Sequence, residues 1–255
     1  MSEGSILSGM GSPRMTIPRS WREGSLTALL VVQAVVVFVV VPAIASGLPL
    51  PSGLTLLVLL GVMCATCILT NDRLAPLLGG IMLPLSAATL ALQLATANRI
   101  AQIAGEATGL LTFLLLGIVV FRAVFSAGRF SGHRIRGAVV LYLNTGLSFA
   151  FVHRLLAQAL PNAYDHVPPS EQVAAFWAAL DYFSFSTLTA LGPGDIVPLQ
   201  PIARGAAVLE STLGQLLPTV LIARVVTLAT SQADAPSETN ESDAHTAQAS
   251  RSMRQ

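Results

Sequence analysis

The chain has 255 residues, of which 53% are hydrophobic and only 11% charged, and its formal net charge is +1. Its mean hydropathy is +0.69, and these values together exclude an ordinary soluble domain. We therefore expect an all-α membrane protein that crosses the bilayer several times, with membrane lipid around it and no nucleic-acid partner.

Six stretches are apolar over roughly the 20 residues that cross a hydrocarbon core. A seventh apolar segment, 172–190, carries Asp181 and several hydroxyl groups and is followed by glycine and proline. We interpret it as a re-entrant half-helix, because such a segment cannot span the bilayer as a regular helix. The six predicted transmembrane helices are 25–46, 53–70, 74–96, 107–127, 137–159 and 203–230.

Composition divides the chain into four parts. Residues 1–24 and 231–255 are rich in small and polar residues, so we expect both ends to be disordered. Residues 25–127 form a four-span unit, and 137–230 form a two-span unit around the half-helix. The first apolar run ends in Ala43-Ile-Ala45, as a cleaved signal peptide does, but its length favours an uncleaved span.

Arginine supplies all of the permanent positive side-chain charge, because the chain contains no lysine. Short cytoplasmic loops collect such charges, and the arginines gather before the first span, after the second and between the fourth and fifth. Both termini are therefore expected in the cytoplasm, and the loop 160–172 on the outer side. The residues concerned are Arg14, Arg19, Arg22, Arg73, Arg129, Arg134 and Arg136.

The most informative run lies between the fifth and sixth spans, from residue 182 to 195. It reads Tyr-Phe-Ser-Phe-Ser-Thr-Leu-Thr-Ala-Leu-Gly-Pro-Gly-Asp. Gly-Pro-Gly-Asp alone would suit an ordinary turn. The whole run, however, resembles the pore helix and selectivity filter of potassium-channel-like proteins, whose filters read Thr-Val-Gly-Tyr-Gly-Asp. The chain departs from that pattern at Ala190, in place of threonine, and at Pro193, in place of tyrosine.

The resemblance implies that backbone carbonyls in this loop bind potassium or another monovalent cation. Gly192 and Gly194 accept the positive φ that turns successive carbonyls to one side. Ala190 lacks the threonine hydroxyl, and Pro193 lacks the side chain that braces the filter, so we expect weak potassium selectivity. The expected ion-binding carbonyls belong to Ala190, Leu191, Gly192, Pro193 and Gly194.

Further candidates flank the loop. Glu210 lies about 10 Å below the outer end of the last span, a depth at which an acid is a functional candidate. We expect it behind the filter, bonded to pore-helix hydroxyls or to Arg204, with direct ion binding as the alternative. The other expected filter supports are Thr187, Thr189 and Asp195. The expected gating hinge is Gly214 with Pro218, and simple small-residue packing between helices is the alternative for Gly214.

Other polar residues receive structural interpretations. Cys64 and Cys67 lie mid-span without a second ligand pair, so packing is favoured over metal binding. His153 and Arg154 either face the acids of the outer loop or snorkel to the interface, and we favour snorkelling. Arg122 is the only arginine of the fourth span, so a voltage sensor is not expected.

The resemblance implies a homotetramer, because each chain contributes one pore loop. We expect a cation channel of the bacterial inner membrane with no cofactor, no metal site and no enzymatic activity. Two alternatives stay open: a non-conducting scaffold or sensor with a degenerate pore, and a secondary transporter. Transporters usually contain two interrupted segments, and this sequence has one.

Overall fold

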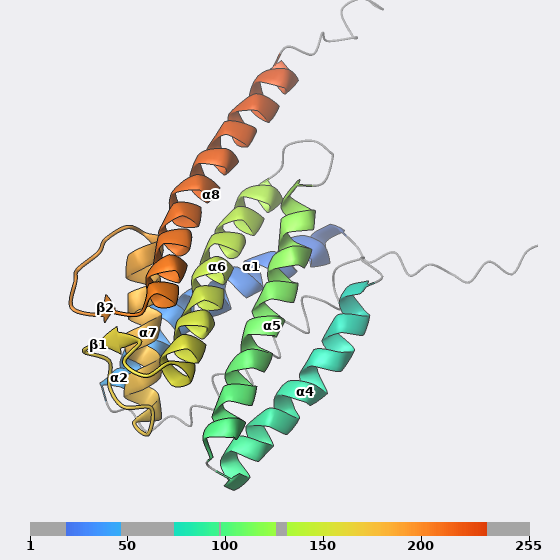
Figure 1. Cartoon of the computed structure of the whole chain (residues 1–255). Coiled ribbons are helices and arrows are strands. Elements are labelled where there is room, and N and C mark those ends of the chain that lie inside the picture. Colours follow the sequence, from blue (N-terminus) through green and yellow to red (C-terminus); the bar gives the residue numbers. More distant parts are fainter. Residues whose placement is uncertain (1–18, 47–73, 97, 126–131, 234–255) are drawn as a thin grey trace, which may run out of the picture.

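The structure is a computed structural model, and it describes residues 19–46, 74–96, 98–125 and 132–233 (Figure 1). The predicted span 53–70, the Cys64–Cys67 pair, and residues 1–18 and 234–255 of the predicted disordered ends lie outside the described residues, whereas 19–24 and 231–233 of those ends are helical. The helices are α1 (Arg19–Val35), α2 (Val41–Ala45), α4 (Leu74–Thr96), α5 (Arg99–Phe125), α6 (Gly132–Ala159), α7 (Val173–Leu188) and α8 (Pro201–Ala233). A π-helical turn, Val36–Val40, joins α1 to α2.

Three described helices are long and apolar enough to cross a membrane. Their apolar stretches are Arg99–Arg122 in α5, Ile135–Ala159 in α6 and Pro201–Arg224 in α8. Shorter apolar stretches occur in Thr27–Ala43, Gly80–Gln93 and Val173–Leu188. The chain is therefore mainly helical and carries several membrane-compatible helices, at the positions where the sequence places apolar runs.

Helix α6 lies between α5 and α8 (Figure 1) and contacts both. Its C-terminal end and the start of α8 are brought together by a two-residue antiparallel pairing of β1 (Tyr164–Asp165) with β2 (Val197–Pro198). Because the chain passes from one end of α6 back to α8 at that same end, the two long helices are antiparallel. Everything between them must begin and finish at one end of the pair.

Helix α7 fills this connection. It contacts α6, α8 and α2, and its 16 residues are about half the length of α8, which has 33. The C-terminal end of α7 reaches Gly214, which lies about 20 Å along α8 at 1.5 Å per residue. The chain then returns through residues 189–200 to the start of α8. The segment that contains α7 therefore begins and finishes at the same end of the α6–α8 pair.

Apolar side chains hold the N-terminal helices against this unit. Leu29 of α1, Leu116 of α5 and Val140 of α6 are all buried in one cluster. A second cluster joins Val36, from the π-helical turn, to Phe151 of α6. The ring of Phe38 also lies 6.4 Å from that of Phe185 on α7. Helix α1 therefore packs on α6, whereas the π-helical turn and α2 pack on the half-length helix α7.

Candidate functional site: the loop after α7 and the polar clusters behind it

Helix α7 ends where its hydroxyl-bearing residues begin to bond the backbone. The Thr189 hydroxyl donates to the Phe185 carbonyl at 2.8 Å, and the Ser186 hydroxyl donates to the Phe183 carbonyl at 2.9 Å. Leu191 N–H then donates to the Ser186 carbonyl at 2.8 Å. The first part of the following loop is therefore tied to the last turn of α7, and its position depends on that helix.

The loop alternates in backbone conformation. Ala190, Gly192 and Gly194 have φ values of 56°, 54° and 79°, all in the left-handed region. Glycine adopts such values freely, whereas in alanine they cost conformational free energy because of the Cβ. The sequence indicated this conformation at the two glycines and gave no signal for it at Ala190.

Among the described residues, none covers the loop. Residues 189–195 are exposed, and the side chain of Leu191 is 71% exposed. The expected ion-binding residues thus lie together on one continuous exposed segment, and the described part of the chain offers them no partner surface.

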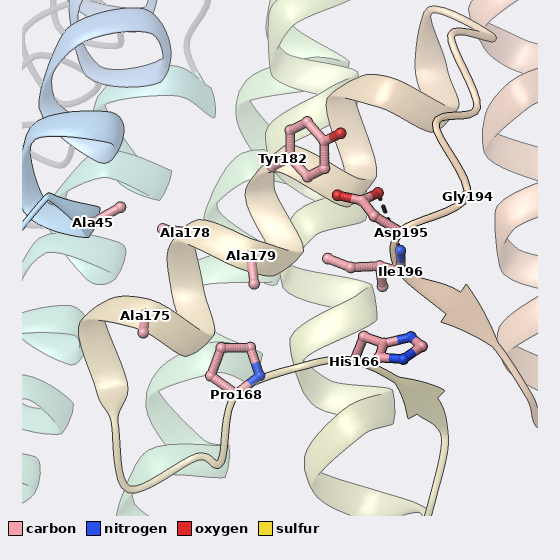
Figure 2. Close-up of a pocket in the computed structure, with 10 residues that line it drawn as sticks. All are labelled: Ala45, His166, Pro168, Ala175, Ala178, Ala179, Tyr182, Gly194, Asp195 and Ile196. Carbon is pink, nitrogen blue, oxygen red and sulfur yellow. Dashed lines mark hydrogen bonds between the residues drawn. The ribbon is translucent and has the colours of Figure 1, made fainter.

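The last residues of the loop, Gly194 and Asp195, border a cavity of about 710 Å³ (Figure 2). Small side chains of α7 form one wall, including Ala175 and Ala178, and Ala45 of α2 lies opposite. Asp195 turns its carboxylate back to accept the backbone N–H of Ile196 at 3.1 Å. The structure therefore leaves space beside Gly194 and Asp195, where a larger side chain could pack.

The remaining predicted support and hinge residues have distinct surroundings. Thr187 is half-buried, and its carbonyl accepts the N–H of Ala190 at 3.0 Å. Gly214 is buried against the end of α7, since a Cβ built on it would lie 2.8 Å from the carbonyl carbon of Leu188. Helix α8 continues through Pro218 to Ala233. Gly214 therefore has the helix-packing role that was the alternative to a gating hinge.

Glu210 is fully buried one turn before Gly214. Its Oε2 lies 2.8 Å from His153 Nε2 and its Oε1 lies 2.5 Å from Ser184 Oγ on α7. His153 Nδ1 lies 2.6 Å from the hydroxyl of Tyr164, and Ser184 Oγ lies 2.7 Å from the Gly146 carbonyl. These contacts join α6, β1, α7 and α8. Arg204, the alternative partner for Glu210, instead donates to the Pro198 carbonyl at 2.9 Å.

A second buried cluster adjoins the first. Arg154 makes an ion pair with Asp181 on α7 and lies 3.5 Å from Glu106 on α5. Its guanidinium also lies over the rings of Phe151 and Trp177, at 4.7 and 5.2 Å. The Arg154 guanidinium therefore pairs with two buried carboxylates and connects α5 to α7.

The prediction that His153 and Arg154 snorkel to the interface is wrong. The two residues are 0% and 5% exposed. His153 contacts Tyr164 of β1 and Glu210 of α8, whereas Arg154 contacts Asp181 of α7 and Glu106 of α5. Snorkelling was inferred from distance to the helix end alone, and the sequence does not show that acids on other helices face these residues.

Among the described residues, no group of three or more His, Cys, Asp or Glu side chains is arranged to hold a metal ion. The arrangement instead offers backbone carbonyls on an exposed loop and two polar clusters behind it. Outside the membrane-compatible helices, burial raises the pKa of the Tyr164 phenol well above its usual range, so this hydroxyl keeps its proton.

Comparison with known proteins supports a channel assignment for this part of the chain. Residues 137–231 match the family described as ion channel. The matched range covers α6, α7, the loop and α8, and stops short of the N-terminal helices. No curated protein and no solved structure matched the chain. The α6–α8 unit is thus similar to an ion-channel domain, the class that its half-length helix and exposed loop also suggest.

Proposed function

We propose that the chain is one subunit of a homotetrameric channel for monovalent cations, with 137–230 as its pore domain. One observation carries the proposal: the loop after a half-length helix has positive φ at alternate residues and remains uncovered. That backbone pattern can present successive carbonyls to one side. Four copies around an axis would give the exposed loops a common surface and complete a ring of carbonyl ligands.

In this proposal α7 is a re-entrant pore helix. Its C-terminal end lies about halfway along α8, where the helix dipole favours a cation. Non-helical backbone at that depth is tolerated where it is buried by protein or lines a watery cavity. The ion-channel match over 137–231 supports this assignment.

The surface of α8 supports assembly. Helix α8 carries exposed apolar side chains along most of its length, which suit contacts with other subunits or with lipid. They are Ile202, Val208, Leu209, Leu216, Val220, Ile222 and Val226.

Weak potassium selectivity is part of the proposal. Ala190 supplies no side-chain oxygen, and the cavity beside Gly194 and Asp195 leaves the outer loop with less lateral support. A ligand cage that is less firmly held should discriminate less between potassium and sodium, if selectivity depends on the number and stiffness of the ligands. We place both termini in the cytoplasm of a bacterial cell, in accord with the arginine distribution.

Ion flux tests the proposal. Purified protein in liposomes should pass potassium and sodium down their gradients, with potassium only modestly favoured. Gly192→Ala should abolish or strongly reduce the flux, because φ at this residue is 54°. Gly205→Ala is the matched control, since a Cβ there would meet nothing within 4 Å. A parent without flux would instead favour the scaffold or sensor alternative.

Oligomeric state needs its own measurement. Amine-directed cross-linkers are unsuitable, because the chain has no lysine. Native mass spectrometry of the detergent-solubilised protein should give a species of four chains of 26.6 kDa. A monomer or dimer that still conducts would refute the shared central pore.

A further inference from the structure

Four side chains and one carbonyl form a continuous buried path behind α7. Its order is Tyr164, His153, Glu210, Ser184 and the carbonyl of Gly146, with successive distances of 2.6, 2.8, 2.5 and 2.7 Å. Every gap is within hydrogen-bonding range. The positions of the hydrogens along this path decide whether Glu210 is charged.

Ser184 is the informative member. A hydroxyl has one hydrogen to donate, yet Ser184 Oγ lies within hydrogen-bonding distance of both the Gly146 carbonyl and Glu210 Oε1. The carbonyl oxygen can only accept. If the Ser184 hydroxyl donates to Gly146, the contact with Glu210 contains a hydrogen only when the carboxyl group itself donates.

An ionised Glu210 leaves this path incomplete in either state of His153. With a charged His153, both ring nitrogens donate, so the Tyr164 hydroxyl must accept, and its own hydrogen has no described acceptor. With a neutral His153, a carboxylate would be buried without a cation, which is costly at this depth. In both cases one of the two Ser184 contacts lacks a hydrogen.

A protonated Glu210 satisfies every contact in one direction. The Tyr164 hydroxyl donates to His153 Nδ1, and His153 Nε2–H donates to Glu210 Oε2. The Glu210 carboxyl then donates to Ser184 Oγ, whose hydroxyl donates to Gly146. No charge is buried, and each donor has an acceptor.

We propose that Glu210 is a protonated acid and acts as a positioning residue that holds the pore helix, through Ser184, against α6 and α8. The position of the loop depends on α7, because the Leu191 N–H donates to the Ser186 carbonyl in the last turn of that helix. Its effect on ion flux rests on the channel function proposed above, whereas the protonation itself does not. Loss of the proton at alkaline pH would leave a buried negative charge on Glu210 and would remove the hydrogen from its contact with Ser184. Both stability and flux should therefore fall as pH rises.

The other titratable groups nearby do not supply a competing charge. On α6, Tyr142 donates its hydroxyl to the Leu188 carbonyl at 3.4 Å, and Arg154 is engaged by Glu106 and Asp181. Those two acids are the charged groups that α5 and α7 bring closest to this path. Of the two titratable groups of β1, Tyr164 lies in the path, as does His153 of α6, whereas Asp165 is exposed and lies 3.8 Å from the His166 ring.

Glu210→Gln is the decisive variant. The glutamine amide can donate to Ser184 and accept from His153, as the protonated acid does. We expect its flux within about twofold of the parent, whereas Glu210→Ala, which leaves buried groups unpaired, should lower flux roughly tenfold or more. The alkaline decline should disappear in Glu210→Gln. Glu171→Gln, in the exposed outer loop, is the matched control and should keep the pH profile of the parent.

Infrared spectroscopy separates this inference from channel function. The parent-minus-Glu210→Gln difference spectrum should contain the C=O stretch of a protonated carboxylic acid, and the Glu171→Gln difference should not. Absence of that band, or a Glu210→Gln variant as impaired as Glu210→Ala, would overturn the proposal. If the parent passes no ions, the channel proposal fails, while the band and the alkaline loss of melting temperature still test the proton.

Discussion

Gly214→Ala tests how tightly α8 packs on the end of α7. The added Cβ would lie 2.8 Å from the Leu188 carbonyl carbon and 3.1 Å from its Cα. Both atoms are backbone, so no flexible side chain can move aside. Overpacking of this kind typically costs about 1–3 kcal/mol, and it should exceed the gain of up to roughly 1 kcal/mol that alanine brings to a helix.

The measurement is the melting temperature of the purified protein in detergent, followed by ion flux in liposomes. Gly205→Ala is the control on the same helix, because a Cβ there meets nothing within 4 Å. It should leave stability unchanged or raise it. Gly214→Ala should melt lower than both the parent and the control.

The same variant distinguishes the packing role from a hinge role. A hinge glycine whose surroundings are open would gain helix stability on substitution by alanine and change only the opening equilibrium. A Gly214→Ala protein at least as stable as the parent would therefore refute the close contact with Leu188. A less stable protein with altered flux would leave the predicted hinge role untested, since packing alone explains the loss.

Three further predictions follow from single residues. Ala190→Gly should raise stability by about 1–2 kcal/mol, because φ is 56° at this residue and glycine has no Cβ. Ala190→Thr should lower stability, because a β-branched residue tolerates positive φ less well than alanine. The double variant Ala190→Thr, Pro193→Tyr should still raise the potassium-to-sodium permeability ratio measured from bi-ionic reversal potentials, and a parent already highly selective would contradict this. Arg154→Met should cost about 3–5 kcal/mol in thermal or denaturant unfolding, because it leaves two buried carboxylates unpaired, whereas exposed Arg204→Met should cost less than about 1 kcal/mol, and equal losses would refute the buried ion pair. Open probability in planar bilayers should change little with voltage, because Arg122 is the one arginine of the predicted fourth span and each gating charge contributes only about 2.3 kcal/mol per 100 mV. A steep activation curve would contradict the expected lack of a voltage sensor.

Much of the helical framework was readable from the sequence, because a run of apolar residues is a local property. The predicted span 137–159 falls within α6, and 203–230 falls within α8. The segment interpreted as a half-helix, 172–190, contains α7. The Gly-x-Gly pattern likewise indicated positive φ at Gly192 and Gly194, since those conformations depend on the absence of a Cβ at each residue.

The side-chain partners across helices were decided by the tertiary structure. Glu210 was expected to bond a pore-helix hydroxyl or Arg204, and the contact with His153 depends on how α6 and α8 are rotated against each other. The burial of Arg154 requires two acids from helices separated widely in sequence. The positive φ of Ala190 arises from the bonds that tie the loop to the end of α7. Hydropathy locates a helix along the chain, whereas the rotation and crossing of helices determine which polar groups must satisfy one another once water is excluded.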